Sequence, residues 1–316
     1  MCIRDRRFGA EIGRAAYLQH GHLANRFYPE LETHDRFGRR IDVVNYHPSY
    51  HALMTTAFRE GIHSSAWTDP KPGAHVVRGA KDFMHGQVES GHQCPTTMTF
   101  SSIACLRAQA ELSAAFEDKI LTCDYDPRNV PIDQKTALTV GMCVTEKQGG
   151  SDVRANTTYA EPLNDRGGGS LYRLTGHKWF VSAPMCDLFM VLAHAPGGLS
   201  CFLVPRWSPD GTKNALQIIR LKEKMGNRSN ASSEAELRGA LGWLVGEEGR
   251  GVATIIDMIG VTRFNCMGAS AGQMRVGLAN ALHYCQERKA FGRPLAEQPL
   301  MANVLADLAL EYEGAI

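Results

Sequence analysis

The sequence of 316 residues contains no apolar run that approaches the roughly 18–20 residues of a membrane-spanning helix, so we expect no membrane association. It carries no marked excess of charge, because 34 Lys and Arg residues face 33 Asp and Glu residues and leave a net charge of +1. This balance excludes a strongly basic nucleic-acid-binding module, but not a local basic patch. The 44% of hydrophobic residues excludes disorder and, at this length, indicates two or three globular domains.

Paired cysteines and metal-binding spacings are also missing. The nine cysteines are odd in number, none forms a C-x-x-C pair, and several lie in apolar runs. This pattern predicts free, mostly buried thiols in a reducing compartment, and residues 1–14 contain no secretory signal, so we expect a cytoplasmic protein. No H-x-x-x-H pair stands beside a carboxylate, so we expect no metal site and place the histidines of the first hundred residues at surface or cap positions.

The first 135 residues have the spacing of helices. Apolar residues recur every three or four positions over 48–66, 74–89 and 101–121, and residues 93–96 are expected to form a turn before the third helix. Within 74–89, the apolar face that we expect to be buried includes Val76, Phe83 and Met84. Turn residues at 124–128 then mark a linker.

Short apolar or alternating runs follow the linker and predict strands over 137–145, 171–182, 188–195, 199–205 and 216–221. Without long helices between them, they favour an antiparallel barrel or sandwich. Helical spacing returns over 252–288 and from 297 onward, and that last helix is still amphipathic at Ile316, so we expect the sequence to stop within a domain. The predicted fold is therefore α+β, with a helical domain at 1–135, a β domain at 136–246 and the start of a helical domain at 247–316.

The most informative segment is residues 143–155, which read CVTEKQGGSDVRA. An apolar strand runs into two glycines, which let a backbone approach a ligand closely, and into hydroxyl donors. This arrangement suits an anionic or heteroaromatic ligand, but it is neither a P-loop nor a G-x-G-x-x-G dinucleotide motif. On spacing alone, a polar hairpin that turns at Gly149 and Gly150 explains the segment equally well.

Residues 143–155 match the flavin-contacting signature of the acyl-CoA dehydrogenases position by position, and further motifs of that family follow in order. They are GHKWFVS at 176–182, KMGNRS at 224–229, Thr262-Arg263, and ERKAFGRPL at 287–295. The sequence therefore resembles the acyl-CoA dehydrogenase family over nearly its whole length, and several details are most similar to the AidB branch, a bacterial branch linked to the adaptive response to alkylation. The resemblance implies a helical domain, a middle antiparallel β-barrel and the start of a helical bundle.

The resemblance also implies FAD as the cofactor and assigns residues to it. The implied flavin contacts lie in the strand 137–145, in the loop that follows it and in the strand 171–182. They are Met142, Cys143, Val144, Thr145, Gly149, Gly150, Ser151, Phe180, Val181 and Ser182. Phe180 stands where the family has a Trp over the flavin ring, and Ser182 where it has a Thr near N5. Arg288 and Gln298 resemble residues that meet the FAD of a neighbouring subunit, which implies a homodimer or homotetramer.

The implied reaction is the α,β-dehydrogenation of a short or branched acyl-CoA, with electrons passed to an acceptor flavoprotein. Such a reaction needs a carboxylate base, and the position where one branch of the family carries it holds Thr262, directly before Arg263. The base is therefore expected beyond Ile316, and Arg263 is expected either to orient it or to form a buried ion pair. The alternative is an AidB-like, flavin-containing, DNA-associated protein with vestigial dehydrogenase activity, in which DNA would be bound only by a further C-terminal part.

Overall fold

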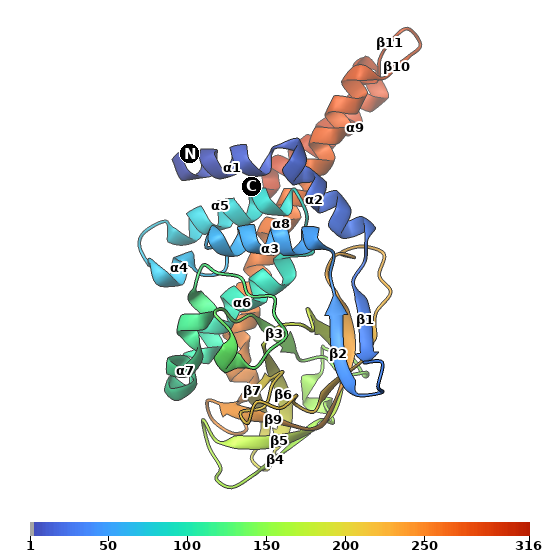
Figure 1. The fold of residues 1–316 in the computed structure, drawn as a ribbon. Coiled ribbons are helices and arrows are strands. Elements are labelled where there is room, and N and C mark those ends of the chain that lie inside the picture. The colour runs from blue at the N-terminus through green and yellow to red at the C-terminus, as the bar shows by residue number, and fades with distance from the viewer. Residues whose placement is uncertain (1–2) are drawn as a thin grey trace.

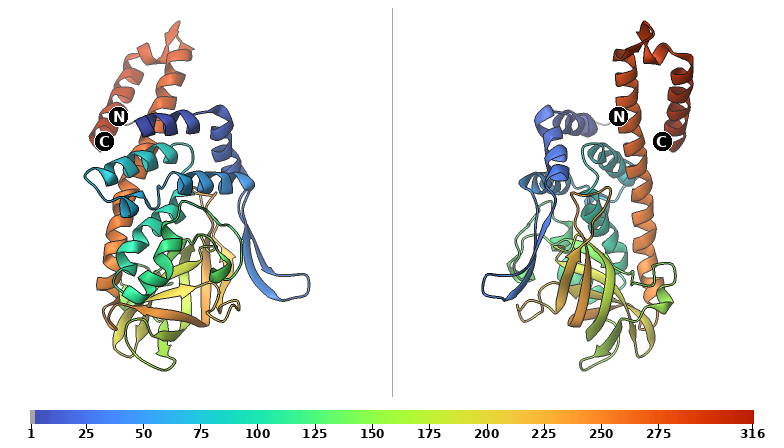
Figure 2. Two further views of the ribbon diagram at one scale, coloured as in Figure 1. Left: turned by 60° about the vertical axis from the view of Figure 1, so that its left-hand side comes forward. Right: turned by 90° about the vertical axis from the view of Figure 1, so that its right-hand side faces the viewer.

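The computed structural model describes residues 3–316. Helices stack above a β-barrel, and a long helical hairpin runs past both and projects beyond them (Figures 1 and 2). The α-helices are α1 (Ile3–Ile12), α2 (Ala15–Arg26), α3 (Pro48–Arg59), α4 (Ser65–Thr68), α5 (Ala74–Gly86), α6 (Gln93–Leu106), α7 (Ala110–Leu121), α8 (Gly251–Glu287) and α9 (Pro299–Ala315). The strands are β1 (Glu30–His34), β2 (Arg40–Asn45), β3 (Val140–Cys143), β4 (Tyr159–Pro162), β5 (Leu171–Ser182), β6 (Leu188–Ala195), β7 (Gly198–Pro205), β8 (Leu216–Leu221), β9 (Ser232–Val245), β10 (Lys289–Ala290) and β11 (Arg293–Pro294).

The barrel is a seven-stranded sheet in the order β3-β6-β4-β5-β9-β7, closed by a further pairing of β6 with β7, and β8 pairs with β9 at its side. Most pairings are antiparallel, as the sequence predicts, but β3 and β4 both run parallel to β6. The bounds predicted for β5, β6 and β8 are confirmed, and β7 begins one residue earlier than predicted. Strands β4 and β9 were not predicted, and β9 pairs with three neighbours, β5, β7 and β8.

The N-terminal region is mainly helical, as predicted, and it also contains one hairpin that the sequence did not predict. Strands β1 and β2 form an antiparallel hairpin that turns at Gly38, whose φ of 77° suits a residue without a side chain. Val44 of this hairpin packs with Ile218 of β8 and with Ala231, so the hairpin covers the side of the barrel. The hairpin lies beside the barrel rather than among the helices (Figure 2).

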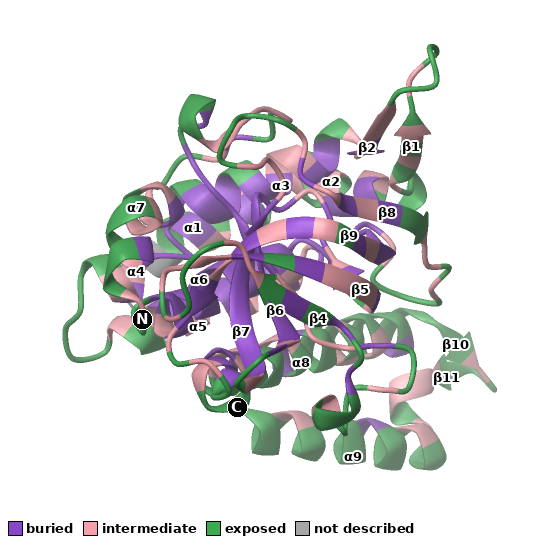
Figure 3. Cartoon of the chain, turned by 90° about the horizontal axis from the view of Figure 1, so that it is seen from below, coloured by how far each residue is buried: buried purple, intermediate pink, exposed green. Residues whose placement is uncertain are grey.

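The helix predicted over 101–121 is in fact two helices, and the turn predicted at 93–96 is wrong. Residues 93–96 are the first turn of α6, where Pro95 is tolerated because the amide it lacks would have no partner within the helix. Most side chains of α6 are buried, because the helix lies between the helical layer and the barrel core, to which it contributes Ile103, Cys105 and Leu106. The purple α6 in Figure 3 accordingly lies at the centre of the molecule.

Helix α5 buries its polar face, contrary to the prediction. Val76 is exposed and Phe83 and Met84 are half-buried, whereas Arg78, Lys81, Asp82 and His85 are buried. These buried groups have partners that lie elsewhere in the chain: Lys81 donates to Glu60, and Arg78 donates to Asn265 of α8. His63, His85 and His92 are also buried, so the expectation that all these histidines lie at surfaces or caps is wrong, although His47 does cap α3 by accepting from the Ser49 amide.

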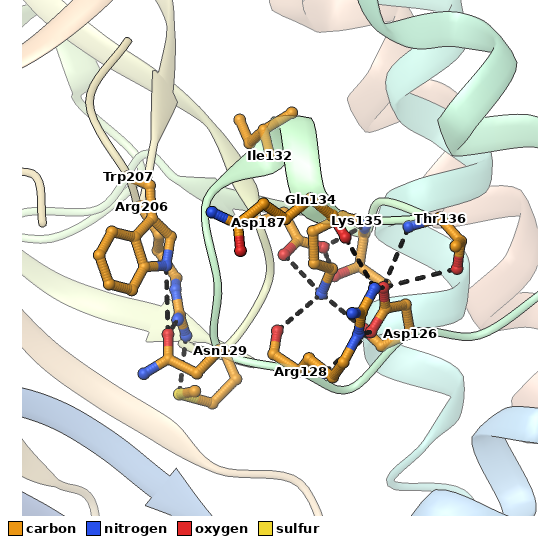
Figure 4. A network of polar contacts seen from close by, with 12 residues as sticks. Asp126, Arg128, Asn129, Ile132, Gln134, Lys135, Thr136, Asp187, Arg206 and Trp207 are labelled. Atoms are coloured by element: carbon orange, nitrogen blue, oxygen red, sulfur yellow. Dashed lines mark hydrogen bonds and ion pairs between the residues drawn. The ribbon is translucent and has the colours of Figure 1, made fainter. Parts of the chain in front are cut away.

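The linker at 124–128 is pinned to the barrel by a network of polar contacts (Figure 4). Asp126 accepts from the Arg128 guanidinium at 2.7 Å and from the Thr136 amide at 3.0 Å. Lys135 donates to the carbonyls of Asp126 and Arg128 and pairs with Asp187, just before β6, at 2.9 Å. These contacts fix the entry of the chain into β3.

Helices α8 and α9 form the projecting hairpin, whose tip carries β10 and β11 (Figure 1). With 37 residues, α8 is about 55 Å long. Among residues 3–316, no helix combines the length and the apolar character that crossing a bilayer requires. Within the same range, no three His, Cys, Asp or Glu residues are grouped so that they could hold a metal ion, and the cysteines from Cys94 onward are free thiols.

Candidate functional site

The loop that follows β3 is shaped by its two glycines. The Gly149 amide donates to the Glu146 carbonyl at 3.0 Å and closes a tight turn, in which Gly149 has a φ of 117° that disfavours any side chain. A Cβ atom at Gly150 would lie 2.9 Å from Oγ1 of Thr145, so the bare backbone of Gly150 packs over the Thr145 hydroxyl. Gly150 and Ser151 are exposed beyond it. The loop thus presents a backbone surface to which a flat ligand can come close.

The buried side chain of Glu146 holds this loop in place. Its carboxylate accepts from Lys178 Nζ at 2.7 Å, from the Thr157 amide at 2.6 Å and from the Thr158 amide at 3.1 Å, as well as from both threonine hydroxyls. These donors hold the pKa of Glu146 at about 2, although burial alone would raise it. Lys178 is only 1% exposed and also donates to the Leu192 carbonyl, so the pair ties the loop to β5 and β6 inside the barrel. Sequence analysis did not assign this pair.

A β-bulge in β5 places two aromatic side chains beside the loop. Lys178 pairs with Ala235 and Val181 with Ser233, so β5 has one residue more than β9 between these points. Because of this extra residue, Lys178 and Val181 both point into the barrel, while Trp179 and Phe180 both lie on its outside. The Trp179 amide donates to the Thr145 carbonyl at 2.9 Å and joins the two segments, and Phe180 is 43% exposed.

The strand residues of the predicted site alternate between the two faces of the barrel wall. The side chains of Cys143 and Val181 are buried in the core, so only their backbone atoms can face a ligand. Met142 and Val144 are half-buried at the edge of that core, and Ser182 is half-buried two residues after Phe180. The backbone bond between Trp179 and Thr145 joins the start of the glycine loop to the strand that carries Phe180 and Ser182. That these residues form one ligand surface stays a prediction.

Basic side chains lie over this surface. Lys222 Nζ lies 3.6 Å from the centre of the Trp179 ring and 4.4 Å from that of Phe180, and it pairs with Glu234 at 2.8 Å. Lys224 Nζ donates to the Asn230 carbonyl and to Ser232 Oγ, and burial lowers its pKa. A cavity of about 350 Å³ opens between these lysines and Tyr28. The charge of the surface is therefore positive, which suits a ligand that carries or acquires negative charge.

A polar group with free hydrogen-bonding capacity lies beside Ser182. The Asn230 side chain is 1% exposed, and neither its amide nitrogen nor its oxygen has a hydrogen-bond partner. Burial raises the pKa of the neighbouring Cys94 thiol, while the side chains of Ser182 and Asn230 partly offset that effect. Three distant segments, α6, β5 and the 224–232 loop, thus meet at Ser182. Sequence analysis missed Cys94 and Asn230, because nothing in their local spacing indicates that they meet.

The remaining predicted site residues lie elsewhere. Arg288 and Gln298 are at the far tip of the helical hairpin, where Arg288 contacts the Tyr284 hydroxyl and Gln298 donates to the Ala290 carbonyl. Figures 1 and 2 show this tip far from β3 and β5 of the same chain. Arg263 is exposed on α8 in the chain described here, and both roles considered for it stay predictions.

Comparison with known proteins shows three family models in succession along the chain. The N-terminal domain of the adaptive response protein AidB matches residues 4–127, the acyl-CoA dehydrogenase middle domain matches 141–240, and the acyl-CoA dehydrogenase C-terminal domain matches 249–315. The chain belongs to the acyl-CoA dehydrogenase family, in its AidB-like branch. The recognition and the fold class predicted from the sequence motifs are confirmed.

Individual relatives agree with this membership. The chain is 48% identical over 310 residues to AidB of Escherichia coli strain K12, an alignment that covers 97% of this chain and 56% of AidB. It is 31% identical over 318 residues to acyl-CoA dehydrogenase family member 11 of Caenorhabditis elegans, covering 96% of this chain and 49% of that protein. The chain thus spans about half the length of the curated relatives it matches.

Solved structures show the same fold. The Caenorhabditis elegans ACDH-11 structure, in complex with C11-CoA, superposes with a TM-score of 0.87 at 28% identity, covering 99% of this chain and 57% of that one. Butyryl-CoA dehydrogenase of Megasphaera elsdenii superposes with a TM-score of 0.74 over 99% of this chain and 77% of that one, and at 16% identity this likeness shows the fold alone.

Proposed function

We propose that the protein to which this chain belongs is an FAD-dependent acyl-CoA dehydrogenase-type oxidoreductase, which introduces an α,β double bond into a short or branched acyl-CoA. One observation carries the proposal: the Trp179 amide bonds to the Thr145 carbonyl at 2.9 Å, which joins the glycine loop, where Gly150 leaves the Thr145 hydroxyl uncovered by a side chain, to the strand that exposes Phe180. An aromatic face, a close-approach backbone and nearby hydroxyls are what a tricyclic ring with polar edges needs. Family membership in the chain's middle domain supports the same ligand.

The residues present fit FAD. A side chain at Gly150 would displace the Thr145 hydroxyl, so the surface is kept flat where a ring would lie, and the unpartnered Asn230 amide leaves hydrogen-bonding capacity beside it. Thr145 and the loop amides would hold the polar edge of the ring, Phe180 would stack on it, and Ser151 would reach its side chain. When bound, the flavin supplies the acceptor of the hydride that leaves the β-carbon.

Glu223 lines the cavity beside this surface and is exposed. Three other carboxylates there are already engaged: Glu146 by Lys178, Glu234 by Lys222 and Arg220, and Glu89 by His92 and Ser229. Among the residues that the structure describes, these three therefore cannot take the α-proton without losing their partners. We propose that the catalytic base is none of these three carboxylates.

We also propose that the chain divides into domains at residues 1–135, 136–246 and 247–316.

The test uses the whole purified protein with its flavin. Under anaerobic conditions, butyryl-CoA or isovaleryl-CoA should bleach the flavin absorbance near 450 nm within minutes of mixing. Full retention of the colour with both substrates, in protein that does bleach with dithionite, would contradict the dehydrogenase proposal while leaving the cofactor proposal intact.

The partners follow from the same proposal. We propose a homodimer or homotetramer, because Arg288 and Gln298 lie at the tip of the α8–α9 hairpin, too far away to serve the surface of their own chain. We also propose an electron-acceptor flavoprotein that approaches the exposed Phe180 edge. Equilibrium sedimentation of the holoprotein tests the first, since a monomer that retains FAD would refute it. Reoxidation of the reduced protein by an added acceptor flavoprotein tests the second.

A second candidate is an AidB-like, flavin-containing protein of the alkylation response with vestigial dehydrogenase activity. The match of residues 4–127 to the AidB N-terminal domain and the 48% identity to AidB favour it. The net charge of +1 gives this chain no overall attraction for DNA, and we propose that a further C-terminal part of the protein makes the DNA contact. Duplex DNA affinity measured against salt decides: each phosphate neutralised should contribute about −0.9 to the slope of log K against log salt, and a slope near zero excludes this candidate.

A further inference from the structure

A second cavity, distinct from the proposed flavin surface, lies where the β1–β2 hairpin covers the barrel. It has a volume of about 130 Å³ and lies between Arg40 and Asp42 of the hairpin, Asn129 of the linker, Arg206 and Trp207 after β7, and Lys213 before β8. We call it the hairpin cavity. Four segments that are far apart in the sequence contribute to it, and none of these six residues belongs to the signature motifs of the family described above.

The polar lining of the hairpin cavity carries an excess of positive charge. Asp42 is the carboxylate among its lining residues, and both of its oxygens are already bonded, by Arg40 Nε at 3.0 and 3.1 Å and by Lys213 Nζ at 2.7 Å. Arg40 and Lys213 therefore share one negative charge. Arg206 adds a third cation, so the six lining residues sum to three positive charges and one negative charge.

Arg206 has no carboxylate of its own. Its guanidinium donates to Asn129 Oδ1, as Figure 4 shows, and it contacts the sulfur of Met185. Both of these partners are neutral. Asp187 is near, but it pairs with Lys135 at 2.9 Å and accepts from the Thr139 amide at 2.8 Å. A cation that is withdrawn from water without a counter-charge is costly, so the cavity has a free-energy reason to take up an anion.

The donors around the cavity suit an oxyanion. Asn129 Oδ1 accepts from both Arg206 and Trp207 Nε1, which leaves the amide nitrogen of Asn129 as a donor. The Arg206 fork can bind two oxygens of one group, and Arg40 and Lys213 add charge on the opposite wall. The volume exceeds that of several waters at about 30 Å³ each, which is room for one tetrahedral group.

From these observations we propose that the hairpin cavity is a binding site for a phosphate group, held between Arg206 and Asn129 on one side and Arg40 and Lys213 on the other. A phosphate dianion matches the two uncompensated positive charges, whereas chloride or a carboxylate neutralises only one. By bonding to the linker, the hairpin and the barrel at once, the bound phosphate stabilises the docking of the hairpin. The phosphate can be free in solution or can belong to a phosphate monoester.

The test follows the thermal midpoint of the purified protein in sodium phosphate and in sodium chloride at matched ionic strength and at pH 7.5. Phosphate at about ten times its dissociation constant should raise the midpoint by about 2 °C above the chloride value. Arg206→Met should abolish this difference. Arg166→Met, which removes an exposed arginine paired with Glu248, is the matched control and should keep it.

Two further arms keep the outcome decisive. If Arg206→Met does not fold, Lys213→Met replaces it, and the linewidth of the phosphate ³¹P resonance is measured with each protein; broadening by the native protein and not by the variant supports the site. Glycerol 3-phosphate is compared with inorganic phosphate, and a larger midpoint rise with the ester identifies a monoester as the ligand. Equal midpoints in phosphate and chloride for the native protein, or an equal phosphate effect in native protein and variant, would overturn the proposal.

Discussion

Replacing Glu146 by Gln tests whether the buried pair beneath the glycine loop holds that loop in place. The substitution keeps the shape of the side chain but removes its charge, and one accepting oxygen becomes a donating amide that faces Lys178 or the threonine donors. Lys178 is then a buried cation whose remaining partner is the Leu192 carbonyl at 2.7 Å. Breaking a buried ion pair from one side costs about 3–5 kcal/mol, and the retained carbonyl puts our expectation at about 3–4 kcal/mol.

The reciprocal and double variants separate the pair from its surroundings. Lys178→Met should cost about 2–3 kcal/mol, because Glu146 keeps four donors from Thr157 and Thr158. The double variant should cost about 2–3 kcal/mol rather than the sum of the two single costs. The reason is that removing both side-chain charges leaves no unpaired charge behind. Equilibrium urea unfolding followed by far-ultraviolet circular dichroism gives all three values. Glu117→Gln, which breaks the exposed pair with Arg107, is the control and should cost about 0–1 kcal/mol.

The same pair predicts a pH dependence. The folded-state pKa of Glu146, about 2, lies below its ordinary value of 4.5, so the unfolded chain binds the proton more readily. The contribution of Glu146 to stability is therefore complete above about pH 4.5 and is lost as the pH falls from there towards about 2. Glu146→Gln should remove this part of the acid sensitivity. Single variants that each cost less than about 1 kcal/mol, or a double variant whose cost equals the sum, would refute the reasoning.

Three further predictions concern the flavin surface and the buried histidines. Gly150→Ala should weaken FAD binding at least tenfold by displacing the Thr145 hydroxyl. Gly260→Ala on α8, where a Cβ atom would meet nothing within 4 Å, should leave FAD binding unchanged. Equal FAD content in the two variants would contradict the loop assignment. Phe180→Leu should raise the dissociation constant of FAD by about 2–10-fold through lost stacking, and Phe180→Trp should restore it, as followed by quenching of flavin fluorescence; no difference between Leu and Phe would exclude stacking. Burial lowers the pKa of His63 from 6.5 to about 4, so the folded state resists protonation and the stability should fall as the pH drops from about 6.5 to about 4. His63→Gln should flatten the plot of unfolding free energy against pH in this range. An unaltered slope would show that His63 is not responsible.

The parts of the fold that could be predicted are the strands and helices whose own residues show a clear pattern of apolar and turn residues. Strands β5, β6 and β8 are apolar or alternating runs between turn residues, and their bounds agree with the structure. Strand β9 was missed because it carries Glu234, Glu236 and Arg238 together with glycines, and its charged residues are balanced by partners on β8 and on β9 itself. The hairpin was missed for a similar reason, since the buried Asp42 side chain is balanced by Arg40 of its own strand and by Lys213, which lies far along the chain.

The buried face of α5 could not be read from α5 itself. Its apolar residues suggest one face, but Lys81 pairs with Glu60, and His85 bonds to His92 at 2.8 Å, which in turn contacts Glu89. Burial of a polar side chain is favourable only when its partner is present, and the partner's position depends on the whole fold. Local periodicity therefore pointed to the less buried side.

The candidate site shows the same division. The glycine loop and Phe180 stand in motifs that spacing and resemblance single out, and the bond between the Trp179 amide and the Thr145 carbonyl joins the two segments. The bulge in β5, which turns both Trp179 and Phe180 outward, cannot be inferred from alternation, because alternation would place one of the two inside. Asn230 and Cys94 meet Ser182 through tertiary contacts between segments some fifty to ninety residues away, and these contacts have no local signal.

Helix α8, about 55 Å long, separates Arg288 and Gln298 from the glycine loop by most of the length of the molecule. Each chain would therefore contribute one half of two different flavin sites. Two defective chains can then compensate for each other: a chain with Phe180→Ala retains a sound tip, and a chain with Arg288→Ala retains a sound loop. Co-expression of the two variants should yield hybrid assemblies in which one site is wild-type in every residue, so that the flavin content rises above that of either variant alone.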